Sequence, residues 1–152
     1  MNRDSNAYTF LFATLMVLVV ASSLAFTASS LKDLQNANVR KEKMQNILAT
    51  IGIESDREEA EKLYREYITA ELSLTQSGAV DAEVSAFEIK LNNELKKPKS
   101  DQRFPMYEAE VEGEKYYIIP LRGAGLWNAI WGYIALEEDK NTIKGAVFDH
   151  TG

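Results

Sequence analysis

The sequence predicts an α+β protein, in which one N-terminal transmembrane helix is followed by further helices and then by an antiparallel β-meander. Three observations lead to this prediction. Residues 7–28 carry no charged side chain, residues 44–68 repeat apolar side chains at helical spacing, and from residue 106 onward β-forming residues alternate with turn signals. Helices first and strands afterwards are typical of the α+β class. We expect a tail at 1–6, the membrane helix at 7–28, a helical linker region at 29–72 and a sheet domain from 73 to 152.

The composition excludes several classes of function. The 152 residues include no cysteine and one histidine, His150, which excludes disulfide scaffolds, thiolate metal sites, cysteine nucleophiles and a His-rich zinc site. The formal net charge is −6, and no basic stripe offsets it, so nucleic acid is not an expected partner. The length suits one compact domain with an appendage.

The apolar segment at residues 7–28 is long enough to cross a bilayer. At about 1.5 Å per residue it covers about 33 Å, against a hydrocarbon core of about 30 Å. Its hydroxyl side chains are expected to bond back to the helix backbone. A cleaved signal peptide is the alternative, because Ser23-Leu24-Ala25 resembles a cleavage site. The run is longer than the usual core of a signal peptide, so we expect an uncleaved anchor.

The charges that flank this segment leave its orientation open. Arg3 precedes it, and a simple count of the cations that follow places the C-terminal side in the cytoplasm. Long domains, however, translocate largely regardless of such counts. The following cations are Lys32, Arg40, Lys41 and Lys43.

Two helical stretches are expected between the anchor and the sheet. The first carries one apolar stripe and ends near Gly52. The second is expected to begin with a capping box of Ser55 and Glu58 and to expose its charged face. The stripe consists of Met44, Ile47, Leu48 and Ile51, and the second buried face of Leu63, Tyr64, Tyr67 and Ile68.

The remainder of the chain is expected to form the sheet. Between residues 73 and 105, the alternation of Phe87, Ile89 and Leu91 fits a short edge strand, although Leu91 and Leu95 also fit a helical turn. A hairpin is predicted around Glu112-Gly113-Glu114. Its strands are 106–111 and 115–120, and further strands are expected at 128–137 and 142–148, joined by a turn at 138–141. Because the chain stops in turn residues beside an uncovered sheet edge, we expect it to be part of a longer protein.

The loop at residues 120–127 carries the strongest functional signal. Gly123 and Gly125 allow positive φ or close approach of a ligand to the backbone, and Arg122 is suited to pair with a phosphate or carboxylate. Trp127 offers a flat apolar face. Together they predict a shelf for a flat anionic cofactor. The structural alternative is a tight corner with a core tryptophan, and no dinucleotide fingerprint is present.

Three blocks make the sequence recognisable: Arg122-Gly123-Ala124-Gly125-Leu126-Trp127, Trp131-Gly132-Tyr133-Ile134-Ala135-Leu136 and Gly145-Ala146-Val147-Phe148-Asp149-His150. They closely resemble the C subunit of the Na⁺-translocating NADH:quinone oxidoreductase, as does the stretch 41–48 after a single anchor. The resemblance runs from the anchor to the last residue, with a variable middle between about 55 and 105.

The resemblance implies a single-span subunit of the bacterial inner membrane with an FMN-binding domain, of which residues 73–152 are the first part. It implies FMN held by a phosphoester to a threonine in a Ser/Asp-Gly-Ala-Thr motif, expected beyond Gly152. Ser77-Gly78-Ala79-Val80 is similar to that motif, but Val80 has no hydroxyl to esterify. The resemblance also implies a cytoplasmic N-terminus, a domain on the outer side and the other subunits of the complex as partners.

Within this interpretation Leu126 and Trp127 are expected to pack beside the flavin ring, with Gly123 and Gly125 allowing its approach. Arg122 is expected either to neutralise flavin charge or to form a surface ion pair, and His150 either to bond to the flavin or to be an ordinary turn residue. Two alternatives stay open: a related flavoprotein subunit of a ferredoxin-linked ion-translocating complex, and a membrane-tethered interaction module that docks through its acidic helical surface.

Overall fold

The computed structural model describes residues 5–150. Arg3, which enters the charge count, and Thr151 and Gly152 lie outside that range. The chain divides into two compact units, residues 1–39 and 40–152. Helix α1, Asn6–Thr50, contributes residues to both units. Each unit is described by itself.

In the first unit α1 is apolar enough to cross a membrane. The mean hydropathy of its most apolar window is 2.2, and none of that window is buried. Ser23 Oγ donates to Val19 O at 2.8 Å, and Thr27 Oγ1 donates to Ser23 O at 2.9 Å. The expected return of hydroxyls to the helix backbone is therefore confirmed for these two residues, and it removes the cost of placing them in hydrocarbon.

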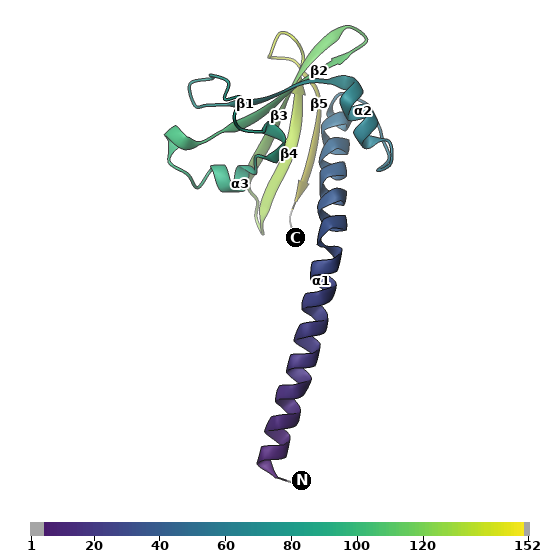
Figure 1. Ribbon diagram of the computed structural model, residues 1–152. Helices are drawn as coiled ribbons and strands as arrows, with labels where there is room; N and C mark the ends of the chain where they lie inside the picture. The colour runs from purple at the N-terminus through teal and green to yellow at the C-terminus, as the bar shows by residue number, and fades with distance from the viewer. Residues whose placement is uncertain (1–4, 151–152) are drawn as a thin grey trace. The chain divides into compact units, whose positions relative to one another are not determined.

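The second unit contains a five-stranded antiparallel sheet whose strands follow one another in chain order, β1 to β5 (Figure 1). The predicted hairpin is confirmed: Glu112 and Gly113 both have positive φ, +55° and +87°, as a two-residue type I′ turn requires. The predicted meander and the α+β class are also confirmed. The strands are β1 Ile68–Leu74, β2 Phe104–Val111, β3 Glu114–Ala124, β4 Ala129–Leu136 and β5 Ile143–His150.

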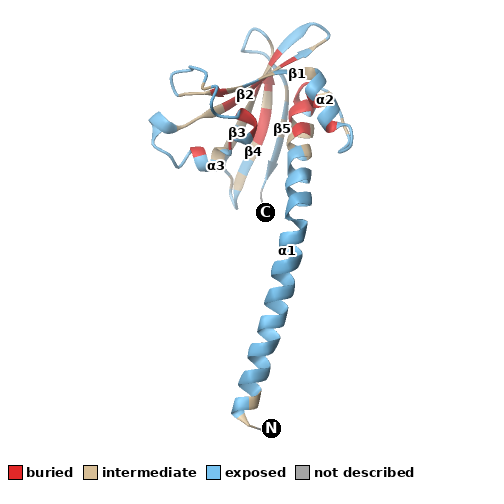
Figure 2. Cartoon of the chain, in the orientation of Figure 1, coloured by how far each residue is buried: buried red, intermediate tan, exposed pale blue. Residues whose placement is uncertain are grey.

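The helical stripe at the end of α1 is part of the core. All four of its residues are buried and pack against Tyr107, Ile118 and Ala135 of the sheet. The helix ends at Thr50, and Gly52 follows with φ +83°. Buried segments gather on the strands and on this part of α1 in Figure 2. Burial of this stripe, at about 25 cal/mol for each Å² of apolar surface, holds the helix to the sheet.

Helix α2, Ala60–Tyr67, begins later than the capping box predicts. Its N-cap residue is Glu59, which makes no side-chain cap hydrogen bond. In the turn that precedes the helix, Asp56 Oδ1 accepts hydrogen bonds from the backbone N–H groups of Glu58 and Glu59 at 2.8 and 2.9 Å. Ser55 Oγ is buried without a partner among the described residues. The capping-box prediction was wrong because an aspartate one residue later reaches the same orphan N–H groups.

Two further element predictions were wrong. Ile68 opens β1, so the helical stretch ends at Tyr67. Its β-branched side chain and those that follow pair with β2, and this pairing overrides the helical spacing. The edge strand at 87–91 is replaced by two short helices, η1 Ala86–Glu88 and α3 Leu91–Glu94, as the alternative of a helical turn at Leu91 predicted. A third short helix, η2, spans Lys99–Asp101 in the predicted connection.

Alternation along the strands gives the sheet two different faces. One face carries the buried residues Tyr107, Tyr116, Ile118, Tyr133 and Ala135 and meets the helices. On the opposite face, Gly132 alone is buried among the described residues of β3, β4 and β5, and it lies beneath Phe148. We call this second surface of β3–β5 the open face.

Candidate functional site

The candidate site is the connection between β3 and β4. Ala124 pairs with Ala129, so residues 125–128 form a four-residue hairpin loop. The N–H of Gly125 donates to Asn128 O at 2.8 Å and closes the loop. Asn128 Oδ1 accepts from the N–H of Ala129 at 2.8 Å. These two bonds satisfy the backbone locally and leave the two central side chains, Leu126 and Trp127, at the tip.

Both tip residues are almost fully in solvent. Leu126 is 91% exposed and Trp127 is 94% exposed. Tryptophan is rarely left this bare, because its large apolar area favours burial. The structural alternative of a core tryptophan therefore does not describe this loop, whose tip exposes two neighbouring apolar side chains.

The two glycines act differently from each other. Neither has positive φ, so of the two expected roles only close approach to the backbone is left. A Cβ on Gly125 would lie 2.6 Å from Asn128 O and 2.8 Å from Ile130 Cγ1, whereas a Cβ on Gly123 would meet nothing within 4 Å. Gly125 therefore allows the loop to close on itself, and Gly123 leaves open space above β3.

Strand register brings His150 to the same end of the sheet as the loop. Gly123 pairs with Ile130, and Ile130 pairs with His150, so the three lie in one row on the open face. Sequence reasoning placed His150 in a turn, which was wrong: β5 continues to His150. In the next row of the open face Gly132 pairs with Leu121 on one side and with Phe148 on the other, and both of these side chains are exposed. The structure thus adds Leu121, Ile130 and Phe148 to the predicted site residues.

Arg122 belongs to the other face. Arg122 pairs with Trp131, and Trp131 pairs with Asp149. Because successive residues of a strand point to opposite faces, this row lies on the face opposite to that of Gly123. Within residues 5–150 no ion pair to the Arg122 guanidinium is found. The structure therefore places Gly123 and His150 in one row, next to the loop that carries Gly125, Leu126 and Trp127, and it places Arg122 on the other face.

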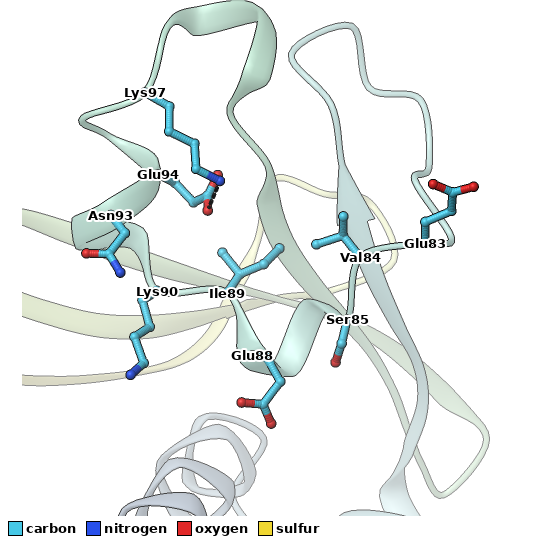
Figure 3. Close-up of a pocket in the computed structure, with 9 residues that line it drawn as sticks. All are labelled: Glu83, Val84, Ser85, Glu88, Ile89, Lys90, Asn93, Glu94 and Lys97. Atoms are coloured by element: carbon cyan, nitrogen blue, oxygen red, sulfur yellow. Dashed lines mark hydrogen bonds and ion pairs between the residues drawn. The ribbon is translucent and has the colours of Figure 1, made fainter.

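A surface pocket of about 610 Å³ lies elsewhere, between the segment 83–85, η1 and α3 (Figure 3). Sequence reasoning did not anticipate it. Its buried carboxylate, Glu94, accepts from Lys97 Nζ at 2.8 Å and from the N–H of Arg103 at 3.0 Å. Glu88 pairs with Arg40. These carboxylates are thus engaged in holding α3 and η1 in place.

The motif Ser77-Gly78-Ala79-Val80 forms a turn. Gly78 has φ +83°, and the N–H of Thr75 donates to Ala79 O at 2.8 Å. Val80 bridges to Leu74. The Ser-Gly-Ala sequence is thus explained by the needs of a tight turn.

No family model matches the chain. Among curated proteins it is similar to the C subunit of the Na(+)-translocating NADH-quinone reductase of Haemophilus ducreyi, 25% identical over 99% of this chain and 65% of the relative. The corresponding protein of Pseudomonas aeruginosa is 28% identical over 99% of this chain and 66% of the relative. The chain thus spans about two thirds of the length of these relatives.

The chain is also similar to solved structures of C subunits. The crystal structure of the C subunit of the Na(+)-translocating NADH-quinone reductase from Parabacteroides distasonis is 36% identical, with a TM-score of 0.73 over 80% of this chain and 59% of that one. The Shewanella oneidensis NqrC structure, 23% identical with a TM-score of 0.64 over 74% of this chain and 60% of that one, shares the fold. In sequence and in fold the chain is thus similar to the C subunits of Na(+)-translocating NADH-quinone reductases.

Proposed function

We propose that this protein carries FMN and relays electrons as a subunit of a Na⁺-translocating NADH-quinone reductase. The observation that carries the proposal is the bare pair Leu126 and Trp127 at the end of an apolar open face. The names of the relatives favour this complex over the ferredoxin-linked one.

The site fits the ring system of a flavin. The isoalloxazine is flat and largely apolar, so an indole suits one of its faces. Leu121, Ile130 and Phe148 supply an apolar floor, and Gly123 leaves the space above that floor free of side-chain atoms. His150 is the polar side chain in the row of Gly123 and Ile130. Arg122 lies on the opposite face, so it is less suited to neutralise the charge of the flavin ring or phosphate than the sequence predicts.

FMN, when bound, supplies one-electron and two-electron redox chemistry. The chain's own residues would bind and orient the ring: Trp127 and Leu126 would cover one side of it and keep water from that side. The His150 imidazole would donate or accept a hydrogen bond at the edge of the ring. No side chain in this set acts as a nucleophile. The covalent phosphoester to a threonine remains part of the proposal on family grounds.

The proposal extends to location and partners. The apolar part of α1 anchors the chain in the bacterial inner membrane, in contact with lipid, with the N-terminus in the cytoplasm and the sheet domain on the outer side. The other subunits of the complex exchange electrons with the flavin and contain the sodium pathway. Cysteine accessibility to a membrane-impermeant reagent at Ser77→Cys tests the orientation, since the chain has no other cysteine.

Trp127→Ala tests the flavin site directly. The full chain in detergent micelles is titrated with FMN, and flavin fluorescence is followed, because a stacked indole quenches it. We expect the dissociation constant to rise about tenfold or more, which corresponds to the loss of about 1.4 kcal/mol of stacking and apolar contact. Trp127→Phe, which keeps an aromatic face, should lose much less.

The matched control is Trp131→Phe, which changes the other tryptophan of the chain, on the opposite face of the sheet. Its FMN titration should match the wild type. If Trp127→Ala left the dissociation constant, the quenching and the flavin midpoint potential unchanged, Trp127 would be removed from the site. If the wild-type chain did not bind FMN, the open face would not be a flavin site in this chain.

A further inference from the structure

The strands that lead into and out of the loop at residues 125–128 form a regular ladder. Residues 117–124 of β3 pair one to one with residues 129–136 of β4, and Ala124 with Ala129 is the last pair before the loop. The ladder therefore fixes the positions of both loop ends. The loop side chains Leu126 and Trp127 are 91% and 94% exposed, so packing does little to hold them. Their direction depends on how the backbone of the loop is held.

Asn128 makes hydrogen bonds on both of its sides. Its backbone oxygen accepts from the N–H of Gly125 at 2.8 Å, across the loop. Bonded and non-bonded pairs alternate along an antiparallel ladder, so in the next pair the N–H of Ala129 points away from β3. The side-chain Oδ1 of Asn128 accepts from that N–H at 2.8 Å. This second bond closes a short ring through the Asn128 backbone, and it holds the ψ angle of the residue that follows Trp127.

The residue types at the two ends of the loop suit these bonds. Asparagine and aspartate carry a side-chain oxygen that reaches neighbouring backbone N–H groups, which a hydrocarbon side chain cannot replace. At the other end, a Cβ on Gly125 would lie 2.6 Å from the backbone oxygen of Asn128, so a larger residue would push the loop ends apart. The loop is thus closed by contacts among its own residues and Ala129.

We propose that Asn128 is a positioning residue for Trp127: its two hydrogen bonds hold the loop in the shape that presents the indole before any ligand binds. The inference rests on the proposed flavin site and adds to that site a residue that acts through Trp127. A side chain that is already ordered loses less conformational freedom on binding, so this positioning raises the affinity for the ligand.

The first test needs no ligand. The parent is Trp131→Phe, which leaves Trp127 as the only tryptophan of the chain. Its nanosecond fluorescence anisotropy is measured in the full chain in detergent micelles. We expect Asn128→Ala to increase the fast local motion of the indole, because the N–H of Ala129 loses its acceptor. Asn128→Asp keeps an Oδ1 acceptor and should restore the motion of the parent.

The second test is a double-mutant cycle with FMN as the probe. Asn128→Ala should raise the dissociation constant about fivefold, the factor for losing one hydrogen bond of ordinary net strength. The quenching at saturation should stay close to that of the parent, because the indole is still present. In a Trp127→Ala background the same substitution should have little further effect, since its action passes through Trp127.

Asn141→Ala is the matched control. Asn141 is an exposed asparagine in the connection between β4 and β5, at the opposite end of β4, so indole motion and FMN binding should equal those of the parent. Circular dichroism establishes that each variant is folded. Unchanged indole motion in Asn128→Ala, or an equal effect of that substitution with and without Trp127, would overturn the proposal. If the wild-type chain bound no FMN, the flavin site would fail, and the anisotropy would still decide the role of Asn128.

Discussion

Gly145→Ala is expected to lower the free energy of unfolding by about 2–3 kcal/mol, the upper part of the range for overpacking a close contact. A Cβ at Gly145 would meet the carbonyl oxygen of Thr50, the last residue of α1, far inside contact distance, and would lie 3.2 Å from Thr50 C. These are backbone atoms of a helix end, so no side-chain rotation relieves the clash. The helix end must move off β5, and the buried stripe of α1 moves with it.

Gly123→Ala is the matched control, since Gly123 is also a strand glycine but its added Cβ would meet nothing within 4 Å. Its stability should stay within about 0.5 kcal/mol of the wild type, as for most exposed substitutions. The measurement is urea unfolding of the full chain in micelles, followed by tyrosine and tryptophan fluorescence. Equal midpoints for the two variants would show that α1 does not rest on Gly145.

The elements that the sequence predicted correctly are those whose signal is local. The stripe of Met44, Ile47, Leu48 and Ile51 identifies its own buried face, and Glu112-Gly113 requires a hairpin turn whatever surrounds it. Ile68 was assigned to the wrong element because pairing with β2, a contact 41 positions along the chain at Ala109, decides its conformation. No local pattern contains that information.

The sequence predicted which residues the candidate site contains better than it predicted how they are arranged. The unusual sequence of residues 122–127 identified the loop whose tip is exposed in the structure. Which residues share a face depends on register: Arg122 and Gly123 are neighbours in sequence but belong to opposite faces, and His150 joins Gly123 through Ile130. Leu121, Ile130 and Phe148 were missed because their apolar character predicts burial, and only the structure leaves them exposed.

The stability of the domain is expected to rise between about pH 8 and pH 10, and Lys43 is the cause. Its ammonium donates to the backbone oxygen of Phe87 and lies 4.4 Å from the centre of the Phe87 ring. Burial lowers the pKa of Lys43 from 10.5 to about 8, with Arg40 adding to the effect and Glu88 and Glu71 opposing it. In this window the unfolded chain holds a proton that the folded chain has released, so stability increases with pH.

The difference between the pKa of Lys43 in the unfolded and in the folded chain corresponds to a change of as much as about 3 kcal/mol in the free energy of unfolding. Tyrosines limit the window, because burial raises the pKa of Tyr133 to about 12 and also raises that of Tyr107 and Tyr64. Their unfolded forms ionise above about pH 10 and then reverse the trend. The experiment is therefore a series of urea unfolding curves of the full chain at pH 7 to 10.

Lys43→Met should flatten this pH dependence, because it removes the titrating amine and keeps an unbranched apolar stem in the same space. Arg40→Met removes the other cation that faces the Phe87 ring, at 4.7 Å from its centre, and should leave most of the rise in place, because burial is the largest cause of the lowered pKa and Arg40 the smallest. Comparing the two variants separates the effect of titrating one buried amine from the effect of losing a positive charge beside η1. A rise that persisted in Lys43→Met would assign it to another group, and a flat wild-type curve would mean that the Lys43 amine is solvated in the folded protein.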